Sequence, residues 1–371
     1  MTEAIERRPL RGGLVGFGFI GAQGHVAAYS SRSDVEIVAV ADICAGRRAL
    51  VPEQLPHARV YESAEALLAA EAGRLDFVDV ATPPCDHAAI ARRALGLGLH
   101  VLCEKPLTTT LADAESLLRE AVRARRVLFP CHNYKHAPVV NAIRDILSSG
   151  RIGKVRSVTL STFRNTHAKG VTEWNTHWRR QVAHSGGGIA MDHGSHTFYL
   201  TFDWLGAWPN AVTAKMSNQQ PDRWDTEDNF SAVLSFPGGG LAHVHLTWTA
   251  GVRKVLYTLQ GDRGAITVDD DELQLAVMRR IDGPDVAQGA VTWDVERRTI
   301  ESDWMDASHT RWFNSMFDQF RSAIDSGDWA GREAQDSVRC IDIITTAYRS
   351  AAAGSQELPL GAPLDGRVGE G

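Results

Sequence analysis

One glycine-rich segment constrains the fold of this chain more than any other feature. It has the pattern G-x-G-x-x-G and consists of Gly16, Phe17, Gly18, Phe19, Ile20 and Gly21. An apolar run precedes it, a helical pattern follows it, and Asp42 ends the next apolar run. In a strand–turn–helix–strand unit, such glycines allow a tight turn and a close approach of the backbone to a pyrophosphate. The segment therefore predicts a dinucleotide site at the edge of a parallel sheet.

Charged residues near this segment bear on which dinucleotide binds. The carboxylate of Asp42 is expected to accept hydrogen bonds from the adenosine ribose and to repel a 2′-phosphate, which favours NAD over NADP. Arg47 and Arg48 qualify this expectation, because an arginine at such a position can accept the phosphate instead. The helix start is expected to bind the pyrophosphate through its exposed N–H groups. We expect NAD as the cofactor.

The first part of the chain alternates short apolar runs with helical patterns. Strands are expected at 13–17, 35–41, 75–81, 100–103 and 127–130, and helices at 63–72, 87–97 and 111–123. Strands separated by helices of this length form a parallel sheet. We therefore expect an α/β dinucleotide-binding domain over residues 10–132.

After about residue 150, strands follow one another with little helix between them. They are expected at 155–163, 211–217, 230–236, 241–248, 255–261, 265–268 and 273–278. The sequences P-G-G-G at 237–240 and G-D-R-G at 261–264 predict turns between strands. This pattern predicts an α+β domain with an open, mainly antiparallel sheet over residues 133–331. Helices are expected at 309–326 and 332–352, the second returning to the first domain.

Composition excludes several classes of protein. The chain is 44% hydrophobic and 23% charged with a net charge of -6, and it has no basic run of the kind that binds nucleic acid. No apolar stretch is long enough to span a membrane, and the start lacks the apolar core of a signal peptide. The five cysteines lie far apart without a C-x-x-C, which fits a reducing compartment. We expect a cytoplasmic protein without nucleic-acid or membrane partners.

Two proline-containing turns end the third and fourth strands of the expected parallel sheet. Their sequences are A-T-P-P-C-D-H at 81–87 and C-E-K-P-L at 103–107. Ligands of open parallel sheets bind outside the carboxyl ends of the strands, so both turns are expected beside the cofactor. The cofactor-binding candidates here are Ala81, Thr82, Pro83, His87, Glu104 and Lys105, together with the glycine segment, Asp42 and Arg47. His87 is expected to begin a helix beside the cofactor rather than to do chemistry.

The segment G-G-G-I-A-M-D-H-G-S-H, residues 186–196, carries the candidate acid–base residues. His196 lies four residues after Asp192, so the two side chains share one face of a helix. Oxidation of an alcohol by a nicotinamide needs a group that removes the hydroxyl proton, and histidine exchanges a proton near neutral pH. Asp192 can orient His196 or bind a neighbouring substrate hydroxyl. A helix cap also explains Asp192, but it does not explain His196.

A metal site is the alternative interpretation of the same segment. Asp192, His193 and His196 offer three ligands within one helical turn. His193 is about 100° round the helix from Asp192, however, and no cysteine or second carboxylate lies nearby in sequence. We therefore expect no bound metal. His193 is expected either to contact substrate or to be a partly buried histidine with a backbone partner.

The ordered motifs resemble those of the glucose–fructose oxidoreductase / inositol dehydrogenase / MocA (Gfo/Idh/MocA) family over roughly residues 10–350. The resemblance rests on G-F-G-F-I-G, A-D at 41–42, A-T-P-P-x-x-H, C-E-K-P-L and G-G-G-x-x-x-D-x-G-S-H. It implies a Rossmann domain, a second domain that binds substrate, and NAD(P)-dependent oxidation or reduction of a sugar, cyclitol or related polyol. The family's catalytic residues fall on Lys105, Asp192 and His196. Family members commonly have an apolar residue at the position of His193.

The resemblance also implies roles for other residues. Lys105 would hydrogen-bond the reacting oxygen and share the acid–base role, and the open sheet would form a homodimer or homotetramer. The loop before the triple glycine often contacts substrate or nicotinamide, which makes Trp174, His177, Trp178 and Arg179 candidates. Asn133 and Lys135 are further candidates for substrate contact, with solvated positions as the alternative. For most of the ten tryptophans, packing in the core or an interface is the expected role.

Two other functions fit the same motifs. One is a redox-neutral glycoside hydrolase or lyase, in which tightly held NAD oxidises a sugar carbon transiently. The other is a non-catalytic NAD-binding sensor, although such a protein would be expected to lose the lysine or the histidine. The sequence does not identify the sugar or the reacting carbon, because one scaffold accepts many substrates by loop variation.

Overall fold

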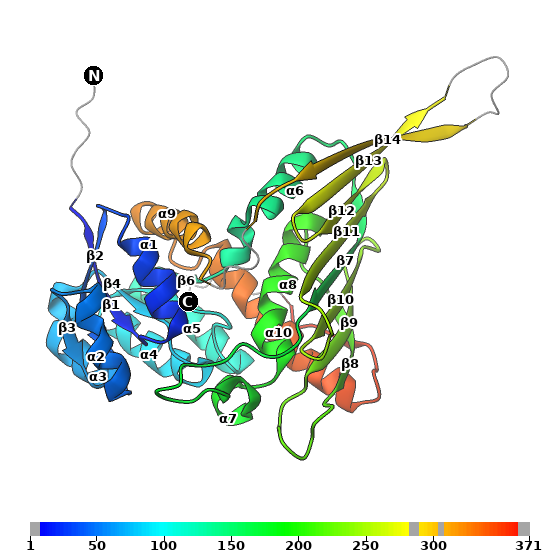
Figure 1. Cartoon of the computed structure of the whole chain (residues 1–371). Coiled ribbons are helices and arrows are strands. Elements are labelled where there is room, and N and C mark those ends of the chain that lie inside the picture. The colour runs from blue at the N-terminus through cyan, green and yellow to red at the C-terminus, as the bar shows by residue number, and fades with distance from the viewer. Residues whose placement is uncertain (1–7, 282–288, 303–307, 363–371) are drawn as a thin grey trace, which may run out of the picture.

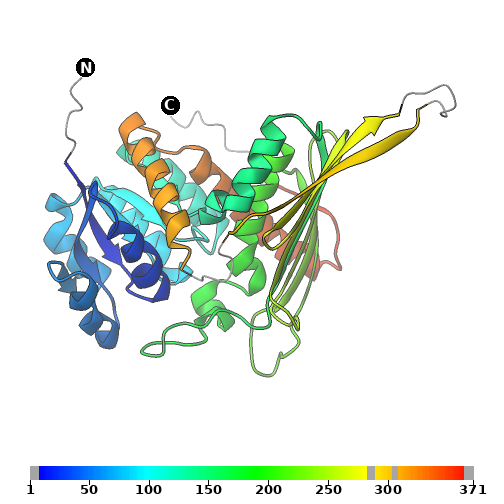
Figure 2. The same cartoon turned by 45° about the horizontal axis from the view of Figure 1, so that its top comes forward.

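The computed structural model describes residues 8–281, 289–302 and 308–362 of the 371-residue chain. The extreme start of the chain and the end of its polar tail therefore lie outside the described residues. Two sheets stand side by side with helices between them, as Figure 1 shows. Figure 2 shows the same two-part arrangement after a rotation.

The first sheet is parallel, as the alternating pattern predicted. Its six strands have the order β3-β2-β1-β4-β5-β6, and every pair is parallel. The strands are β1 (Leu10–Val15), β2 (Val35–Ala41), β3 (Arg59–Tyr61), β4 (Phe77–Val80), β5 (His100–Cys103) and β6 (Leu128–Pro130). The chain leaves β3 at one edge and returns as β4 beside β1, so the strand order reverses there. A crevice forms at the carboxyl ends of the strands at such a point.

Helical segments connect these strands. They are η1 (Ile20–Val26), α1 (Ala27–Tyr29), α2 (Ala45–Gln54), α3 (Ala64–Glu71), η2 (Ala72–Arg74), α4 (Pro84–Gly96) and α5 (Leu111–Ala124). The sequence did not predict α2, because Pro52 lies inside it and only Val51 is buried, so it has almost no apolar stripe. Strand β3 also went unpredicted, since none of its three residues is buried.

The second sheet is open and mainly antiparallel, as predicted. Its order is β14-β13-β12-β11-β7-β10-β9-β8-β15, and β7 with β10 is the one parallel pair among the described strands of this sheet. The strands are β7 (Val155–Phe163), β8 (Ala211–Ser217), β9 (Asn229–Ser235), β10 (Leu241–Thr247), β11 (Lys254–Gly261), β12 (Gly264–Asp269), β13 (Glu272–Arg280), β14 (Val291–Thr299) and β15 (Leu358–Pro359). Strand β14 was not predicted, because seven of its nine residues are exposed and four are charged.

Helices cover one face of this second sheet. The face turned toward the first domain carries α6 (Pro138–Ser148), α8 (Ile189–Leu205) and α10 (Arg332–Ala352), and Figures 1 and 2 show no described helix on the other face. Three short helical segments complete this half of the chain: η3 (Asn133–His136), η4 (Trp178–Arg180) and α7 (Val182–Ser185). The uncovered face of this sheet can therefore contact the surface of another protein chain.

The two C-terminal helices tie the domains together. The aromatic face of α9 (Thr310–Ser326) packs into the core of the parallel sheet, where Phe320 meets Phe77 and Phe129. This helix lies in the range expected for the second domain, yet it packs on the first. Helix α10 contacts α5 and β6 of the first domain as well as α8 and β8 of the second. It therefore packs against both domains.

Two further expectations concern membrane-spanning helices and the cysteines. No helix within the described ranges is long and apolar enough to cross a membrane. All five cysteines are free, as their spacing predicted.

Candidate active site

A cavity of about 800 Å³ opens at the carboxyl ends of the parallel strands and extends to α8 and the end of β7. It brings together most of the residues selected from the sequence. From the first domain these are Gly16, Gly18, Phe19, Ile20, Asp42, Arg47, Ala81, Thr82, Pro83, Glu104 and Lys105. From the rest of the chain they are Asn133, Trp174, Trp178, Arg179, Asp192, His193 and His196.

The glycine segment has the shape that a dinucleotide requires. Gly16 has φ +98°, and a Cβ there would lie 2.6 Å from the carbonyl oxygen of Ala81. Both the backbone conformation and the lack of space therefore exclude a side chain. A Cβ on Gly21 would lie 2.3 Å from the Gly16 carbonyl oxygen. Gly18 instead lines the cavity, and nothing lies within 4 Å of its Cβ position. The turn thus leaves an open cradle at the start of η1, which fits the pyrophosphate of a dinucleotide.

Three of the predicted cofactor contacts, Phe17, Gly21 and His87, do not line this cavity. The ring of Phe17 is fully buried, and Gly21 serves helix packing. His87 is also fully buried, with its ring nitrogens 2.9 Å from the Pro106 carbonyl oxygen and 2.8 Å from the Thr82 carbonyl oxygen. His87 therefore links the two proline-containing turns from inside the protein core.

Asp42 and Arg47 line the cavity just after β2, where the adenosine ribose of a bound dinucleotide is expected. The Asp42 carboxylate accepts hydrogen bonds from the backbone N–H groups of Phe17 and Cys44, both at 2.7 Å. The Arg47 guanidinium donates to the Phe17 carbonyl oxygen and to Glu173. Glu173 belongs to the loop before α7, so this ion pair joins the loop of the second domain to the first domain.

Lys105 and Asp192 meet across the two domains. The Lys105 Nζ donates to the Asp192 carbonyl oxygen at 2.8 Å and lies 3.4 Å from a carboxylate oxygen of the same residue. Arg179 reaches that carboxylate oxygen from the other side at 3.2 Å. Burial alone would raise the pKa of Asp192, but Lys105 and Arg179 outweigh it and hold the pKa far below its usual range. Asp192 is therefore a fixed anion between two cations.

His196 is held by aromatic neighbours. Its ring stacks on Tyr134 with centroids 3.9 Å apart, and its Nδ1 lies 2.8 Å from the Tyr199 hydroxyl. That hydroxyl accepts a hydrogen bond from the Tyr134 backbone N–H, and burial raises the pKa of Tyr199 far above its usual range. Tyr199 therefore keeps its hydrogen, and donation of that hydrogen to Nδ1 would place the ring proton of His196 on Nε2. Burial, with the charge of Lys105, holds the pKa of His196 well below its ordinary value.

His193 lines the cavity beside Asp192 and donates no hydrogen bond to a backbone carbonyl in the described part of the chain, so the expected alternative of a backbone partner is not found. Its Nε2 lies 3.8 Å from Asp192. Burial lowers the pKa of His193 to about 3, against the favourable charge of Asp192, so the ring is neutral near pH 7.

A buried ion-pair network lies behind the E-K-P turn. His25 on η1 places Nδ1 2.6 Å from Asp79 and Nε2 3.0 Å from Glu104, and the other Glu104 oxygen accepts the Lys105 backbone N–H. Burial would lower the pKa of His25, but the two carboxylates raise it to about 10. The network therefore holds an imidazolium that supports Glu104 and, through it, the turn that carries Lys105.

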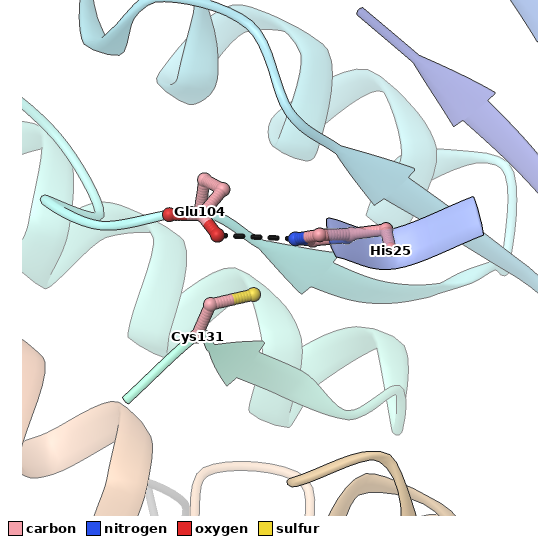
Figure 3. Close-up of side chains that lie close together, drawn as sticks. All are labelled: His25, Glu104 and Cys131. Carbon is pink, nitrogen blue, oxygen red and sulfur yellow. Dashed lines mark hydrogen bonds and ion pairs between the residues drawn. The ribbon is translucent and has the colours of Figure 1, made fainter. Parts of the chain in front are cut away.

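Figure 3 shows Cys131 beside this network, so that His25, Glu104 and Cys131 are the one group among the described residues whose ligand atoms are spaced for a metal ion. Both ring nitrogens of His25 already face carboxylates, and its raised pKa keeps both protonated. Burial raises the pKa of the Cys131 thiol far above its usual range. A protonated imidazole and a neutral thiol do not ligate metals, so the group fits an ion-pair network.

The start of α8 corrects another expectation. Asp192 does not cap the helix; Glu227 accepts the backbone N–H groups of Gly188 and Ala190, each at 2.9 Å. A Cβ on Gly188 would lie 1.9 Å from the Glu227 carbonyl oxygen, which explains a glycine there. With Glu227 as the cap, the Asp192 carboxylate is left to face Lys105 and Arg179.

Two weaker candidates lie away from the cavity. Lys135 is buried and bonded to Glu333 and Asp336, so it is neither solvated nor at the site. His177 does not line the cavity, and its Nδ1 lies 2.9 Å from His167. Lys135 joins segments distant in sequence, whereas His177 forms its hydrogen bond within one loop.

Comparison with known proteins identifies the family of this chain. Residues 10–132 match the model of the oxidoreductase family with an NAD-binding Rossmann fold, and residues 140–267 match the GFO/IDH/MocA C-terminal domain. The chain belongs to the Gfo/Idh/MocA family. It is therefore an oxidoreductase whose first domain has the NAD-binding Rossmann fold, as the ordered motifs predicted.

Several characterised members of the Gfo/Idh/MocA family are similar to this chain. The D-glucoside 3-dehydrogenase of Escherichia coli (strain K12) is 25% identical over 68% of this chain and 74% of its own length. The inositol 2-dehydrogenase of Rhizobium meliloti (strain 1021) is 25% identical over 92% and 97%.

Solved structures show the same fold. GenD2 from gentamicin A biosynthesis, in complex with NAD, has a TM-score of 0.79 at 24% identity and covers 97% of this chain and 98% of its own. A levoglucosan dehydrogenase complex with NADH and levoglucosan has a TM-score of 0.79 at 21% identity, covering 95% and 100%. At these identities the likeness to the two structures concerns the fold alone.

Proposed function

We propose that this chain oxidises a secondary alcohol of a sugar, glycoside or cyclitol with NAD, or reduces the corresponding ketone. The main support is the hydrogen bond from Lys105 of the Rossmann domain to Asp192 of the second domain. Both residues line the cavity that His196 also lines. The D-glucoside and inositol dehydrogenases among the relatives support the substrate class. When bound, the nicotinamide takes the hydride from the carbon in oxidation and returns it in reduction.

Lys105 exchanges the proton of the reacting oxygen. In oxidation the amine form of Nζ accepts the hydroxyl proton as the C–H bond breaks, and in reduction the ammonium returns it. The Asp192 carbonyl and carboxylate stabilise that ammonium and hold Nζ in place. His196 is less suited to carry the proton, because burial and the charge of Lys105 both disfavour its imidazolium form.

His196 donates a hydrogen bond to the reacting oxygen. Tyr199 fixes the ring proton on Nε2, the nitrogen that makes no hydrogen bond within the described residues. Such a donor stabilises negative charge that develops on the oxygen while the proton moves. Trp174 and Trp178 line the cavity nearby and offer faces on which the C–H groups of a sugar ring stack.

The uncovered face of the second sheet forms the interface of a homodimer or homotetramer. Its strands carry small residues that are exposed, such as Thr159, or half-buried, such as Val233, and the described helices leave it open. Pairing two such faces would cover a surface that a lone sheet leaves to solvent.

The test is NADH formation at 340 nm with inositols, aldoses and simple glycosides, using NAD and NADP, with and without a chelator. We expect one substrate class to give NADH with NAD, unaffected by the chelator. Protein that purifies with nicotinamide bound but forms no net NADH with any substrate would contradict the proposal and favour the redox-neutral reaction. Loss of activity with the chelator would contradict the metal-independent mechanism.

A further inference from the structure

Arg164 is a cation of the cavity wall that the proposed mechanism does not use. It follows β7 directly, and its backbone is fixed by hydrogen bonds to Thr247 and Ala250 at the end of the neighbouring strand β10. Its side chain lines the cavity together with Asp192 and His193. Burial lowers the pKa of His193, Asp192 opposes this effect, and the charge of Arg164 lowers the pKa further, as expected for side chains that lie close together.

The hydrogen bonds of Arg164 leave one edge of its guanidinium open. Nη1 donates to the carbonyl oxygens of Phe163 at 2.8 Å and Lys254 at 3.2 Å. Nε and Nη2 donate no hydrogen bond in the part of the chain that the structure describes, and Arg164 forms no ion pair there. Nε–H and Nη2–H are parallel donors on one edge, and this pair matches the two oxygens of a carboxylate.

The part of the cavity wall that the second domain supplies carries more positive than negative charge. Among the described residues that line the cavity from the second domain, Asp192 is the only carboxylate, whereas Arg164, Lys169, Arg179 and Arg253 are cationic. Asp192 is already shared by Lys105 and Arg179. Sugar hydroxyls need acceptors as well as donors, and cationic side chains supply donors only.

We propose that the substrate carries an anionic group, and that Arg164 binds this group through the Nε–Nη2 edge while the alcohol is held at Lys105. The substrate is then an acidic sugar or its glycoside, such as a uronate. The inference rests on the proposed dehydrogenase function and narrows its substrate. A phosphate group offers the same pattern of oxygens, so the experiment compares the two anions.

The test uses substrates that differ at one substituent. Methyl glucoside is compared with methyl glucuronide, methyl galactoside with methyl galacturonide, and glucose with glucose 6-phosphate, by kcat/KM for NADH formation. Arg164→Gln removes the charge, Arg164→Lys keeps the charge without the paired donors, and Arg156→Gln removes an exposed arginine that pairs with Asp262 outside the cavity. Since a hydrogen bond to a charged group contributes on the order of a 10- to 100-fold preference, we expect at least about tenfold higher kcat/KM for an acidic member.

In Arg164→Gln, kcat/KM for the acidic member should fall about 10- to 100-fold, mainly through KM, while that for the neutral member changes less than about threefold. Arg164→Lys should lie between, and Arg156→Gln should resemble the wild type. Preference for glucose 6-phosphate would assign a phosphate to the site instead of a carboxylate. Oxidation of the neutral members alone, or equal losses for both members in Arg164→Gln, would overturn this inference but not the proposed function. No NADH from any member of any pair would overturn both.

Discussion

Asp42 is the residue that we expect to select between NAD and NADP. Its carboxylate is held by two backbone N–H groups, while Arg47 is engaged by Phe17 and Glu173, and Arg48 by the carbonyl oxygens of Asp42 and Ile43. Neither arginine is therefore held ready for a 2′-phosphate, which strengthens the expectation of NAD over NADP.

In Asp42→Ser we expect the ratio of kcat/KM for NAD to that for NADP to fall by about 100-fold, because the repulsive carboxylate is removed. Steady-state kinetics with both nucleotides measure the ratio, and Asp222→Ser, an exposed acidic residue, is the control. An unchanged ratio would mean that Asp42 does not face the ribose.

Tyr199 acts through His196 as a positioning residue. Tyr199→Phe keeps the ring but removes the hydroxyl that fixes the Nε2–H form, so kcat should fall by about tenfold with little change in KM. Tyr61→Phe removes a hydroxyl of the Rossmann domain that is bonded to Glu71 and does not line the cavity, and serves as the control. An unchanged kcat in Tyr199→Phe would contradict the assigned form of His196.

Single site residues were predictable where they belong to a recognised sequence motif. Lys105, Asp192 and His196 were selected from sequence and all line the cavity, although their catalytic roles stay predictions. His25 and Arg164 were missed. His25 lies on the helix after the glycine segment, but its partners stand 54 and 79 residues away, so its position carried no local signal. Arg164 had one signal, since a polar residue directly after a strand often belongs to a site.

At the scale of elements, η1 supports the E-K-P turn through the His25 network. Removing one partner of a buried ion pair leaves an uncompensated charge, so His25→Leu should lower the free energy of unfolding by about 3–5 kcal/mol. The pKa of His25 is raised to about 10 from an unfolded value near 6.5, so its contribution is fully present below pH 6.5 and is lost as the pH rises through about 10.

Urea unfolding of wild type and His25→Leu at several pH values measures this effect. The difference in free energy of unfolding between the two proteins should be largest near pH 6 and should shrink toward pH 10. A difference that is constant over this range would contradict the assignment of an imidazolium at His25.

Element boundaries were largely predictable, but element partners were not. The ranges of β2, β5, β7, β8 and α10 agree with the periodicity of apolar residues, because each presents a strong apolar pattern. The aromatic stripe of α9 predicted a buried helix but not that its partner is the Rossmann sheet. Phe320 contacts Phe77 and Phe129 of that sheet, which lie far before it in the sequence, so no local pattern identifies this partner.

At the scale of the whole molecule, the open face of the nine-stranded sheet predicts self-association. Thr159 lies on the central strand β7, and its exposed side chain points away from the helices. Static light scattering should give a dimer or tetramer for the wild type, and Thr159→Glu should shift the mass toward the monomer, because paired faces would bury the new charges. A monomeric wild type would contradict the proposed interface.

The central claim is that Lys105 moves the proton of an alcohol whose hydride goes to NAD. Single-turnover NADH absorbance at 340 nm, with the substrate found in the panel, tests it most directly in wild type, Lys105→Ala and Lys215→Ala, a lysine exposed on β8. We predict that the rate falls about 100- to 10,000-fold in Lys105→Ala and is unchanged in Lys215→Ala, the range expected for loss of a general acid–base group. A Lys105→Ala rate within a few-fold of wild type would contradict the account.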